Sequence, residues 1–365
     1  MRKGWEYKKL GEICYSDLGK TLNKSKDLGN MRPYLCAINI LWDSIDLTTL
    51  KEACFKDDEI DRYTVKYGDL LVCEGGDTGR AAIWDRKEPI LYQNALHRLR
   101  FKEDVDARFI MYNLWHKKQI GEIDHKYSKG VTILHLVKSA LLSIPILLPP
   151  LSTQLAIVSE LDKINELIRL KKEQLKDFDN LAQSLFYEMF GDPMENEKGW
   201  EVKKLGEVYK MKSGDSLSTK NFIEGNIPVY GGNGISGYHN QYNKDGSYII
   251  IGRVGVYCGN ARIVKGQFWL TDNAFELFYD KSIQNEVFVC KLLNLLNLRQ
   301  YANAAAQPVI SNNTLKHISI PLPPLSLQRL FAQRIEQIER EKSEVQKSIQ
   351  DLETLLASRM QYWFE

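Results

Sequence analysis

Two long segments of the chain repeat apolar residues at alternating spacings of four and three. Neither 152–190 nor 326–365 contains glycine or proline. This pattern predicts an α-helix with one apolar seam, and a seam sustained over more than four heptads is typical of a coiled coil. The seam positions are Ile157, Leu161, Ile164, Ile168, Leu175 and Phe178 in the first segment, and Phe331, Ile335, Ile338, Val345, Ile349 and Leu352 in the second.

The ends and the pairing of these helices can also be predicted. Ser152 and Ser326 are expected N-caps, and Gly191 is an expected C-cap. The two seams could join two copies of the chain, or pair antiparallel within one chain and hold the rest of the molecule at a fixed distance. We favour the second arrangement because both helices are present in every molecule at high effective concentration. Apolar residues outside the seam would be left for a partner protein, namely Leu155, Phe186 and Phe364.

The remaining sequence predicts two bodies made of short strands, turns and a few helices. Apolar runs predict strands at 70–73 and 248–251, each followed by a glycine-rich turn, and helices are expected at 108–121 and 283–299. The expected fold class is therefore α+β, with two mixed α/β domains related by an internal pseudo-two-fold repeat and separated by two long antiparallel coiled-coil helices. The expected domains are 1–150, the helix 151–191, 192–324 and the helix 325–365.

The chain is an imperfect tandem repeat. Gly-Trp-Glu-Tyr-Lys-Lys-Leu-Gly-Glu at 4–12 returns as Gly-Trp-Glu-Val-Lys-Lys-Leu-Gly-Glu at 199–207, an offset of 195. Pro-Pro-Leu-Ser-x-Gln at 149–154 returns at 323–328, an offset of 174, so the second copy is 21 residues shorter between these motifs. Asn94-Ala95 and Asn273-Ala274 are a further shared pair. Two different bodies on two similar helices suit a molecule that reads a two-part target.

Charge is distributed unevenly between bodies and helices. The whole chain carries a net charge of only +2, yet 1–150 has 24 Lys/Arg against 21 Asp/Glu and 197–324 has 14 against 10. The helical segments 151–190 and 325–365 have 5 against 7 and 6 against 7. Mildly basic bodies on slightly acidic helices favour nucleic-acid contact by the bodies. No apolar run is long enough to cross a membrane and no secretion signal precedes the first motif, so we expect a cytoplasmic protein without membrane contact.

Motifs for catalysis, cofactors and metals are missing from the sequence. Gly19-Lys20-Thr21 resembles the end of a phosphate-binding loop, but Cys14 stands where the first glycine is required. The glycines at 232, 234 and 237 match a dinucleotide fingerprint without a helix to follow them. Neither the six cysteines nor the six histidines show metal-ligand spacing. We expect no catalytic residue, metal or cofactor in this chain.

Polar residues in the predicted loops are the candidate DNA contacts. Arginine and tyrosine at the tip of a turn can enter a groove, and the backbone N–H groups of such turns can meet phosphates. The candidates in the first body are Lys20, Asp77, Thr78, Arg80, Lys126, Lys129 and Thr132. In the second body they are Tyr230, Asn233, His239, Arg253, Tyr257, Gln307 and Asn313.

The order of these motifs resembles the DNA-specificity subunit of type I restriction–modification systems over essentially the whole chain. The resemblance rests on the two Gly-Trp-Glu-x-Lys-Lys-Leu-Gly-Glu motifs, the two Pro-Pro-Leu-x-x-Gln helix entries and their duplication, with further matches at 68–71 and 230–240. It implies double-stranded DNA as ligand, two target-recognition domains, and a bipartite site with an unread spacer. It also implies two modification (methyltransferase) subunits that use S-adenosylmethionine, and restriction subunits that use ATP and Mg²⁺, as partners.

Two alternatives remain open at this point. The chain could be the recognition subunit of a type II-like system that cuts on both sides of its site, which only the partner enzyme's sequence would reveal. It could also be a coiled-coil scaffold with no role in DNA binding. A nuclease or methyltransferase in its own right is disfavoured by the missing motifs.

Overall fold

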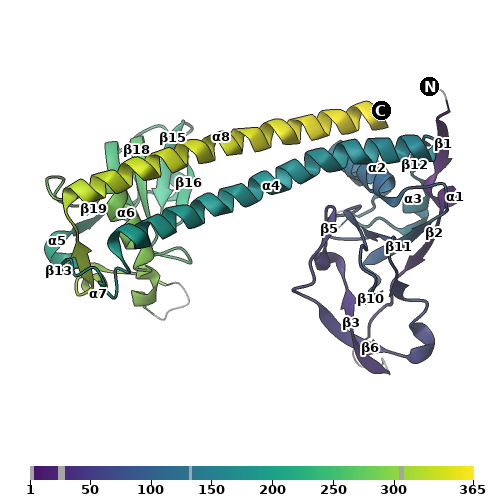
Figure 1. Cartoon of the computed structure of the whole chain (residues 1–365), viewed down its shortest axis with the longest axis horizontal. Helices are drawn as coiled ribbons and strands as arrows, with labels where there is room; N and C mark the ends of the chain where they lie inside the picture. The colour runs from purple at the N-terminus through teal and green to yellow at the C-terminus, as the bar shows by residue number, and fades with distance from the viewer. Residues whose placement is uncertain (1–3, 24–28, 131–133, 304–307) are drawn as a thin grey trace. The chain divides into compact units, whose positions relative to one another are not determined.

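The computed structural model describes residues 4–23, 29–130, 134–303 and 308–365, and these form two compact units (Figure 1). Unit 1 comprises Met1–Lys172 with Ser348–Glu365, and unit 2 comprises Glu173–Lys347. The two long helices, α4 (Leu151–Phe190) and α8 (Leu325–Phe364), therefore each contribute one half to each unit. Each helix starts where the sequence predicted a domain boundary, whereas the units divide in the middle of the helices.

The repeated sequence motifs meet each other in space within each unit. In unit 1, β1 (Glu6–Lys9) pairs antiparallel with β12 (Pro145–Leu148), from Glu6 opposite Leu148 to Lys9 opposite Pro145. In unit 2, β13 (Glu201–Lys204) pairs in the same register with β20 (Ser319–Leu322). Short helices follow at α1 (Leu10–Ile13) and α5 (Leu205–Val208). In each unit, one strand of the pair therefore comes from the repeat with an offset of 195, and the other comes from the repeat with an offset of 174.

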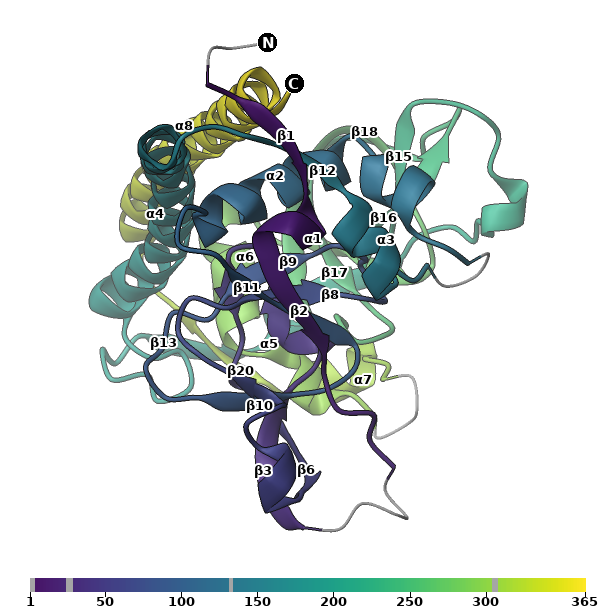
Figure 2. The same ribbon diagram turned by 90° about the vertical axis from the view of Figure 1, so that its right-hand side faces the viewer.

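The sheets of unit 1 carry its body. One sheet has the order β2–β11–β8–β9 and a second has the order β6–β3–β10–β7, with β3 and β10 parallel, and a small β4–β5 pair is separate. Figure 2 looks onto this unit and shows β3 and β6 reaching away from the helices. The strands are β2 (Cys14–Leu18), β3 (Asn30–Leu35), β4 (Ile40–Leu41), β5 (Ser44–Ile45), β6 (Lys51–Phe55), β7 (Thr64–Val65), β8 (Leu70–Cys73), β9 (Ala81–Ile83), β10 (Ile90–Tyr92) and β11 (Leu96–Phe101).

Unit 2 joins the corresponding strands into one sheet of six, in the order β14–β19–β17–β18–β15–β16. β15 and β18 are parallel, as β3 and β10 are in unit 1. The tight hairpin between β15 and β16 replaces the long connection between β3 and β6, which accounts for much of the length difference between the copies. The strands are β14 (Lys210–Ser213), β15 (Ile227–Gly231), β16 (Gly234–His239), β17 (Lys244–Gly252), β18 (Ala261–Leu270) and β19 (Ala274–Phe278).

The shorter helices agree with the sequence in place but not always in length. α2 (Ala107–Gln119) matches the predicted helix, and Asp106 caps it by accepting from Phe109 N. α6 (Glu286–Leu295) is shorter than the predicted 283–299, because Asn285 caps its start and Asn297 has a left-handed φ of 46° just beyond its end. The other short helical segments are α3 (Lys138–Ser143), α7 (Asn312–Leu315), η1 (Ala37–Asn39), η2 (Asp57–Glu59), the π-turn η3 (Ile123–Tyr127), η4 (Thr219–Asn221) and η5 (Leu298–Tyr301).

The predicted serine N-caps of the long helices are wrong. α4 and α8 begin at Leu151 and Leu325, one residue earlier, and the carbonyl of Pro150 accepts the N–H groups of Thr153 and Gln154. Gly191 follows the last residue of α4 with φ 75°, as a C-cap glycine should, and its N–H donates to Tyr187 O. The indole of Trp200 then donates to Phe190 O at 2.8 Å, satisfying one of the last carbonyls of the helix.

The glutamine of each Pro-Pro-Leu-Ser-x-Gln motif connects a long helix to a short one. Gln154 is fully buried; its amide donates to Asp104 O and Pro149 O and accepts from Asp106 N, at the start of α2. Gln328 repeats this with Ile283 O, Pro323 O and Asn285 N, at the start of α6. One buried amide therefore satisfies three backbone groups in each unit, which explains why the motif recurs.

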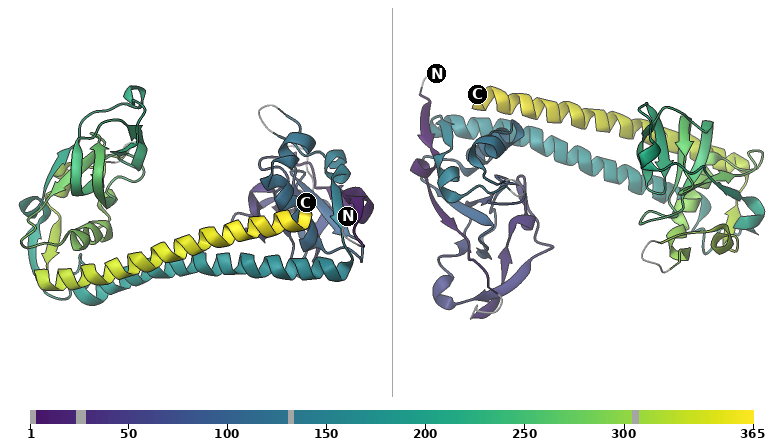
Figure 3. Two further views of the ribbon diagram at one scale, coloured as in Figure 1. Left: turned by 90° about the horizontal axis from the view of Figure 1, so that it is seen from above. Right: turned by 180° about the vertical axis from the view of Figure 1, so that it is seen from behind.

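Halves of α4 and α8 run side by side in opposite directions within each unit (Figure 3). In unit 1 Glu160 pairs with Arg359, and Lys172 contacts Glu353 at 2.8 Å. In unit 2 Asp179 contacts Lys342 at 2.8 Å. All twelve seam residues named from the sequence are buried or half-buried. Phe331, Ile335 and Ile338 of the seam pack in unit 2 with four aromatic or apolar residues of α4, which are Phe178, Leu185, Phe186 and Phe190.

Two of the three residues expected to be left for a partner are instead core residues. Phe186 is fully buried and packs among Phe190, Phe288 and Phe331, with ring centroids 4.9–5.7 Å apart. Phe364 is also buried and lies edge-on to Phe109. Both were misplaced because the helices bury a broader face than the two seam positions of a heptad. Leu155 is about half exposed, as expected.

Candidate functional site

Each unit attaches a small loop to the glycine-rich turn that follows its central strand. In unit 1 the stem of this loop closes between Lys129 and His135, and His135 also bridges to Gly75 in the turn. In unit 2 Asn303 N donates to Val309 O, and Val309 bridges to Val254 in the turn. The stem positions of the two units are related by the offset of 174, and the turn positions Gly75 and Val254 by an offset of 179. Both units therefore carry the same construction, which we call the turn-and-loop edge. Candidates Thr132 and Gln307 lie in the loops, outside the described residues.

A charged network holds this edge in unit 1. The buried Thr78 hydroxyl donates to Asp124 Oδ1 at 2.9 Å, and Lys118 contacts Asp124 at 2.7 Å and Asp77 at 3.0 Å. Burial raises the pKa of Asp124, but the hydrogen bonds from Lys118 and Thr78 outweigh it and leave that pKa below its ordinary value. Asp77 and Thr78, both candidates from the sequence, therefore use their polar atoms to fasten the turn to α2 and η3.

The basic candidates of unit 1 differ in exposure and in whether their charged groups are already bonded to the protein. Lys126 and Lys129 are exposed, and Lys126 lies 3.3 Å from Glu122. Arg80 is half-buried and donates to Ala37 O at 2.9 Å, with Asp77 at 3.6 Å. Lys20 is buried, donating to Cys54 O and pairing with Glu59 at 2.7 Å, so its ammonium is enclosed by the body.

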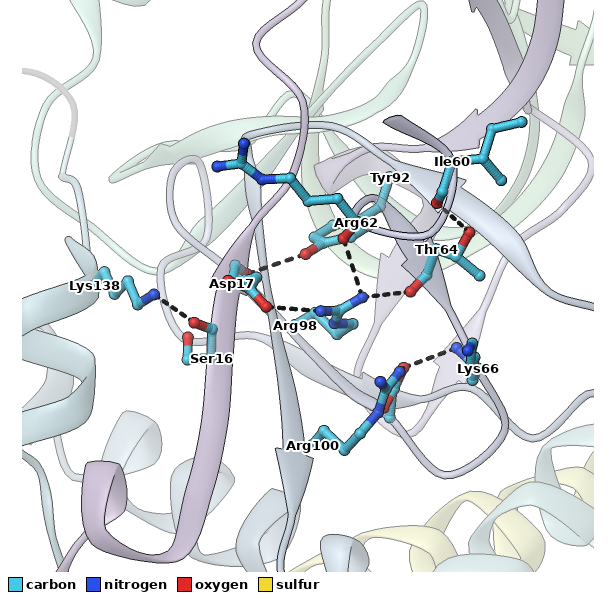
Figure 4. Close-up of polar contacts among 11 residues, drawn as sticks. Ser16, Asp17, Ile60, Arg62, Thr64, Lys66, Tyr92, Arg98, Arg100 and Lys138 are labelled. Atoms are coloured by element: carbon cyan, nitrogen blue, oxygen red, sulfur yellow. Dashed lines mark hydrogen bonds and ion pairs between the residues drawn. The ribbon is translucent and has the colours of Figure 1, made fainter. Parts of the chain in front are cut away.

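An arginine cluster on β11, drawn in Figure 4, was not found from the sequence. Arg98 donates to the carbonyls of Arg62 and Thr64, at 3.2 and 2.5 Å, and pairs with Asp17 at 2.8 Å. Its guanidinium lies 5.7 Å from the ring of Tyr92, whose hydroxyl donates to Asp17 O.

The next residue on the same face of β11 forms a second arginine pair. Arg100 binds the buried Asp69 through two bonds of 2.7 and 2.6 Å, and Asp69 also accepts from Lys66 N. The alternation of arginines at 98 and 100 was the available signal, because residues two apart share one face of a strand. Both guanidinium groups are held by carboxylates, so this cluster stabilises the sheet.

Unit 2 has an uncharged hollow of about 570 Å³ at its turn-and-loop edge. The tip of the β15–β16 hairpin forms one wall and the turn after β17 forms another, and both Asn233 and Tyr257 line it. Glycines allow these two walls to meet: a Cβ on Gly232 would lie 2.5 Å from Val254 O. The lining residues are Leu217, Ser218, Thr219, Phe222, Gly231, Gly232, Asn233, Gly234, Ile235, Ser236, Val254, Gly255, Val256, Tyr257, Thr271 and Asn273.

The other candidates of unit 2 lie around this hollow or behind it. Arg253 is half-buried, lies 5.5 Å from the Phe275 ring, and makes long contacts of 3.4 Å to Ser213 Oγ and Asp272 O. Tyr230 packs edge-on against Phe268. His239 is buried against Trp269 and accepts from Ile223 N.

Asn313 stands apart from the hollow, on the short helix α7. It is exposed, and its side chain accepts from Lys316 at 3.3 Å. The structure therefore brings together Asn233 and Tyr257, with Arg253 beside them. Tyr230 and His239 belong to the packing of the sheet.

The structure corrects one equivalence drawn from the sequence. Glu74 N donates to Ala95 O in unit 1, and Arg253 N donates to Asn273 O in unit 2, both at 2.9 Å. Ala95 therefore corresponds to Asn273, and the shared Asn-Ala pair is out of register by one residue. The same bonds place Glu74 in unit 1 where unit 2 has Arg253. The carbonyls of these two residues accept from Leu136 N and Ile310 N, which keeps the backbone equivalent while the side-chain charge is reversed.

The residues that the structure describes hold no group of three or more His, Cys, Asp or Glu side chains arranged to bind a metal ion. Within the same ranges no helix is both long and apolar enough to span a membrane.

The sequence matches one protein family and is similar to several proteins of that family. The family model described as the type I restriction modification DNA specificity domain matches residues 2–177 and 197–354. The EcoprrI specificity subunit of Escherichia coli is 36% identical over 143 residues, which are 38% of this chain and about a third (35%) of that protein. The putative MjaX specificity subunit of Methanocaldococcus jannaschii is 24% identical over 395 residues, covering 96% of this chain and 92% of that protein.

Solved structures resemble the fold across the whole chain. The type I restriction–modification S subunit from M. genitalium aligns with a TM-score of 0.58 at 18% identity, covering 99% of this chain and 96% of that one. A chain from a structural study of assembly and conformational transition in the type I system aligns with a TM-score of 0.62 at 19% identity, covering 99% and 97%. With sequence identities of 18% and 19%, these two similarities show that the chain shares the fold of these proteins.

Proposed function

The chain belongs to the family of type I restriction–modification DNA specificity domains, and from this premise we propose that it reads a bipartite double-stranded DNA site. Unit 1 would read one half-site and unit 2 the other, with an unread spacer between them. The observation that carries this proposal is the turn-and-loop edge, which recurs at equivalent positions with different side chains. A conserved backbone with exchanged side chains suits two readers of different sequences.

The proposed contacts are the candidates that remain accessible on each edge. In unit 1 these are Lys126 and Lys129, with Arg80 beside them; in unit 2 they are Asn233 and Tyr257, with Arg253 beside them. Lysines supply phosphate contacts that position the DNA, whereas asparagine and arginine can distinguish base edges. Thr132, Gln307 and Asn313 stay in the proposed set. Lys20, Asp77, Thr78, Tyr230 and His239 would support the reading loops from behind.

The paired halves of α4 and α8 would form an antiparallel coiled coil that sets the spacer and recruits partner subunits. Leu181 in unit 2 and Leu355 in unit 1 are related by the offset of 174 and are both about half exposed. Two equivalent apolar positions on two helices suit two copies of a modification subunit. Methyl transfer from S-adenosylmethionine would take place in those subunits, and ATP-dependent cleavage in restriction subunits. We place this non-catalytic role in the cytoplasm.

Methylome sequencing of cells that carry this chain with its modification subunit tests the proposal. The expected result is one methylated motif made of two defined halves and a spacer of constant length, absent when this chain is deleted. A continuous motif without a spacer would contradict the bipartite reading. A coiled-coil scaffold without a DNA role predicts no change in methylation and no salt-dependent DNA binding by the complex.

A further inference from the structure

The hollow of unit 2 is lined by polar side chains that have no hydrogen-bond partner among the described residues. The side-chain amides of Asn233 and Asn273 and the hydroxyl of Tyr257 form no hydrogen bond to any residue in the described ranges. In unit 1 the polar side chains of the matching edge, Thr78 and Asp124, are bonded to each other. Free amides that face a hollow are available to a ligand.

The chemistry of the lining restricts what that ligand can be. None of the sixteen lining residues is charged. A site built for phosphate would normally include lysine or arginine. Apolar surface is prominent instead: Val256 is 61% exposed and Tyr257 is 51% exposed, and both line the hollow beside the amides. The lining therefore combines amide hydrogen-bonding groups with apolar surface.

The edge includes a two-stranded ribbon, a form that the major groove of DNA admits. β15 and β16 form a two-stranded ribbon whose tip is Gly232-Asn233, between the paired residues Gly231 and Gly234. The major groove of B-DNA, about 12 Å wide, admits a two-stranded ribbon. Gly234 has φ 97° and backs onto the guanidinium of Arg262, so a side chain there would be strained and would clash. Glycine at this position therefore allows the two-residue turn at the ribbon tip to form.

We propose that this hollow reads an A·T base pair in the half-site of unit 2, with Asn233 binding adenine and Val256 and Tyr257 contacting the thymine methyl group. An asparagine amide donates to adenine N7 and accepts from the adenine N6 amino group, and thymine alone presents a methyl group in the major groove. The proposal rests on the function proposed above and adds a base identity to it. Asn273, which also lines the hollow, supplies a second amide.

The complex of this chain with its modification subunits gives the first test. DNA carrying its methylated motif, with each position of the unit 2 half-site varied in turn, would be used to measure binding. Wild type should prefer A·T at one position. Asn233→Ala should lose about 5- to 150-fold of that preference and keep every preference in the unit 1 half-site. The matched control is Asn226→Ala, an exposed asparagine of the same unit that does not line the hollow.

Base analogues separate the two contacts. Replacing the adenine by 7-deazaadenine should weaken binding by wild type and leave Asn233→Ala unaffected, because the same hydrogen bond is removed either way. Replacing the thymine by uracil should weaken DNA binding by wild type more than binding by Val256→Ala, because Tyr257 still contacts the methyl group in that variant. If Asn233→Ala instead weakened all DNA sequences alike, the residue would be a backbone contact and the proposal would be wrong.

The outcomes also separate this proposal from the function on which it depends. A half-site without an A·T pair, or unchanged base preferences in Asn233→Ala, would overturn the base assignment while leaving the bipartite reading intact. Loss of any defined half-site in wild type would overturn the proposed function itself. Circular dichroism and assembly with the modification subunits confirm that each variant is folded.

Discussion

The two units share a frame and differ at the edge we assign to DNA. The frame comprises the β1–β12 and β13–β20 pairs, the buried Gln154 and Gln328, and the stem that bridges to the glycine-rich turn. At the edge, unit 1 uses charge, with Lys118 between Asp77 and Asp124, whereas unit 2 has a neutral hollow. The difference teaches that duplicated backbone geometry can be kept while the side chains presented to a ligand are replaced.

The β15–β16 hairpin of unit 2 and the β3–β6 connection of unit 1 also differ in whether their asparagine is bonded within the protein. In unit 2 the tip residue Asn233 has its amide free among the described residues. In unit 1 the longer connection buries Asn39, whose side chain accepts from Cys36 N and donates to Asp46 O and Thr49. One asparagine is left for a ligand, and the other holds together the connection that includes β4 and β5.

Exchange of a whole body should have the largest effect. If the frame is common and the edge is specific, replacing 1–150 by the same region of a relative should change one half of the methylated motif completely. The other half and the spacer should stay the same, because they depend on unit 2 and on the helices. Methylome sequencing of the chimera measures this. A change in both halves would show that the two units do not read their half-sites independently.

Loss of the framing glutamines should destabilise each unit separately. Gln154→Ala and Gln328→Ala each remove the side-chain partner of three backbone groups, which should cost about 2–4 kcal/mol of unfolding free energy. Hydrogen exchange should rise at the start of α2 in the first variant and at the start of α6 in the second. Gln333→Ala, at an exposed position of α8, is the matched control. Equal loosening of both units by either variant would show that the frames are not independent.

Disruption of the charged network should affect only the unit 1 half-site. Asp124→Asn keeps an acceptor for Thr78 but removes the charge that holds Lys118, so the turn at 74–80 should loosen. We expect discrimination at the unit 1 half-site to fall about tenfold, equivalent to about 1.4 kcal/mol, without change at the other half-site. Binding to DNA with single substitutions in each half measures both. Asp61→Asn, exposed in the same unit, should change neither.

Acidification should produce the smallest effect, again in unit 1. His97 is buried on β11 and donates through Nε2 to Leu136 O at 2.8 Å; its burial lowers its pKa below the ordinary 6.5. The folded unit therefore keeps this histidine neutral while the unfolded chain takes up a proton first. Its stability should be full above about pH 6.5 and should fall as the pH drops below that value.

Thermal unfolding between pH 8 and pH 5 measures this dependence. His97→Gln should be less stable than wild type at pH 8 but should show a flatter profile, because the buried titrating group is gone. His125→Gln, at an exposed position of the same unit, should keep the wild-type profile. A profile for His97→Gln as steep as that of wild type would assign the acid sensitivity to other groups.

The sequence by itself determined the repeat, the two long helices and the α+β class. These follow from local periodicity and from motifs that serve the frame, such as the buried glutamine that each copy needs at the start of a long helix. The strand at 70–73 was predictable for the same reason, since a short apolar run bounded by turn residues has few other solutions.

Tertiary structure alone decided which polar residues are free. Lys20, Thr78 and His239 looked like contacts because they are polar and lie in loops, yet the fold buries them against Glu59, Asp124 and Trp269. Phe186 and Phe364 looked exposed, yet the bodies cover them. The register of Asn94-Ala95 against Asn273-Ala274 was misassigned by one residue, and only the ladder hydrogen bonds revealed it. Burial and hydrogen-bond partners depend on residues distant in sequence, so a local pattern records which groups are polar but not whether the folded protein has already used them.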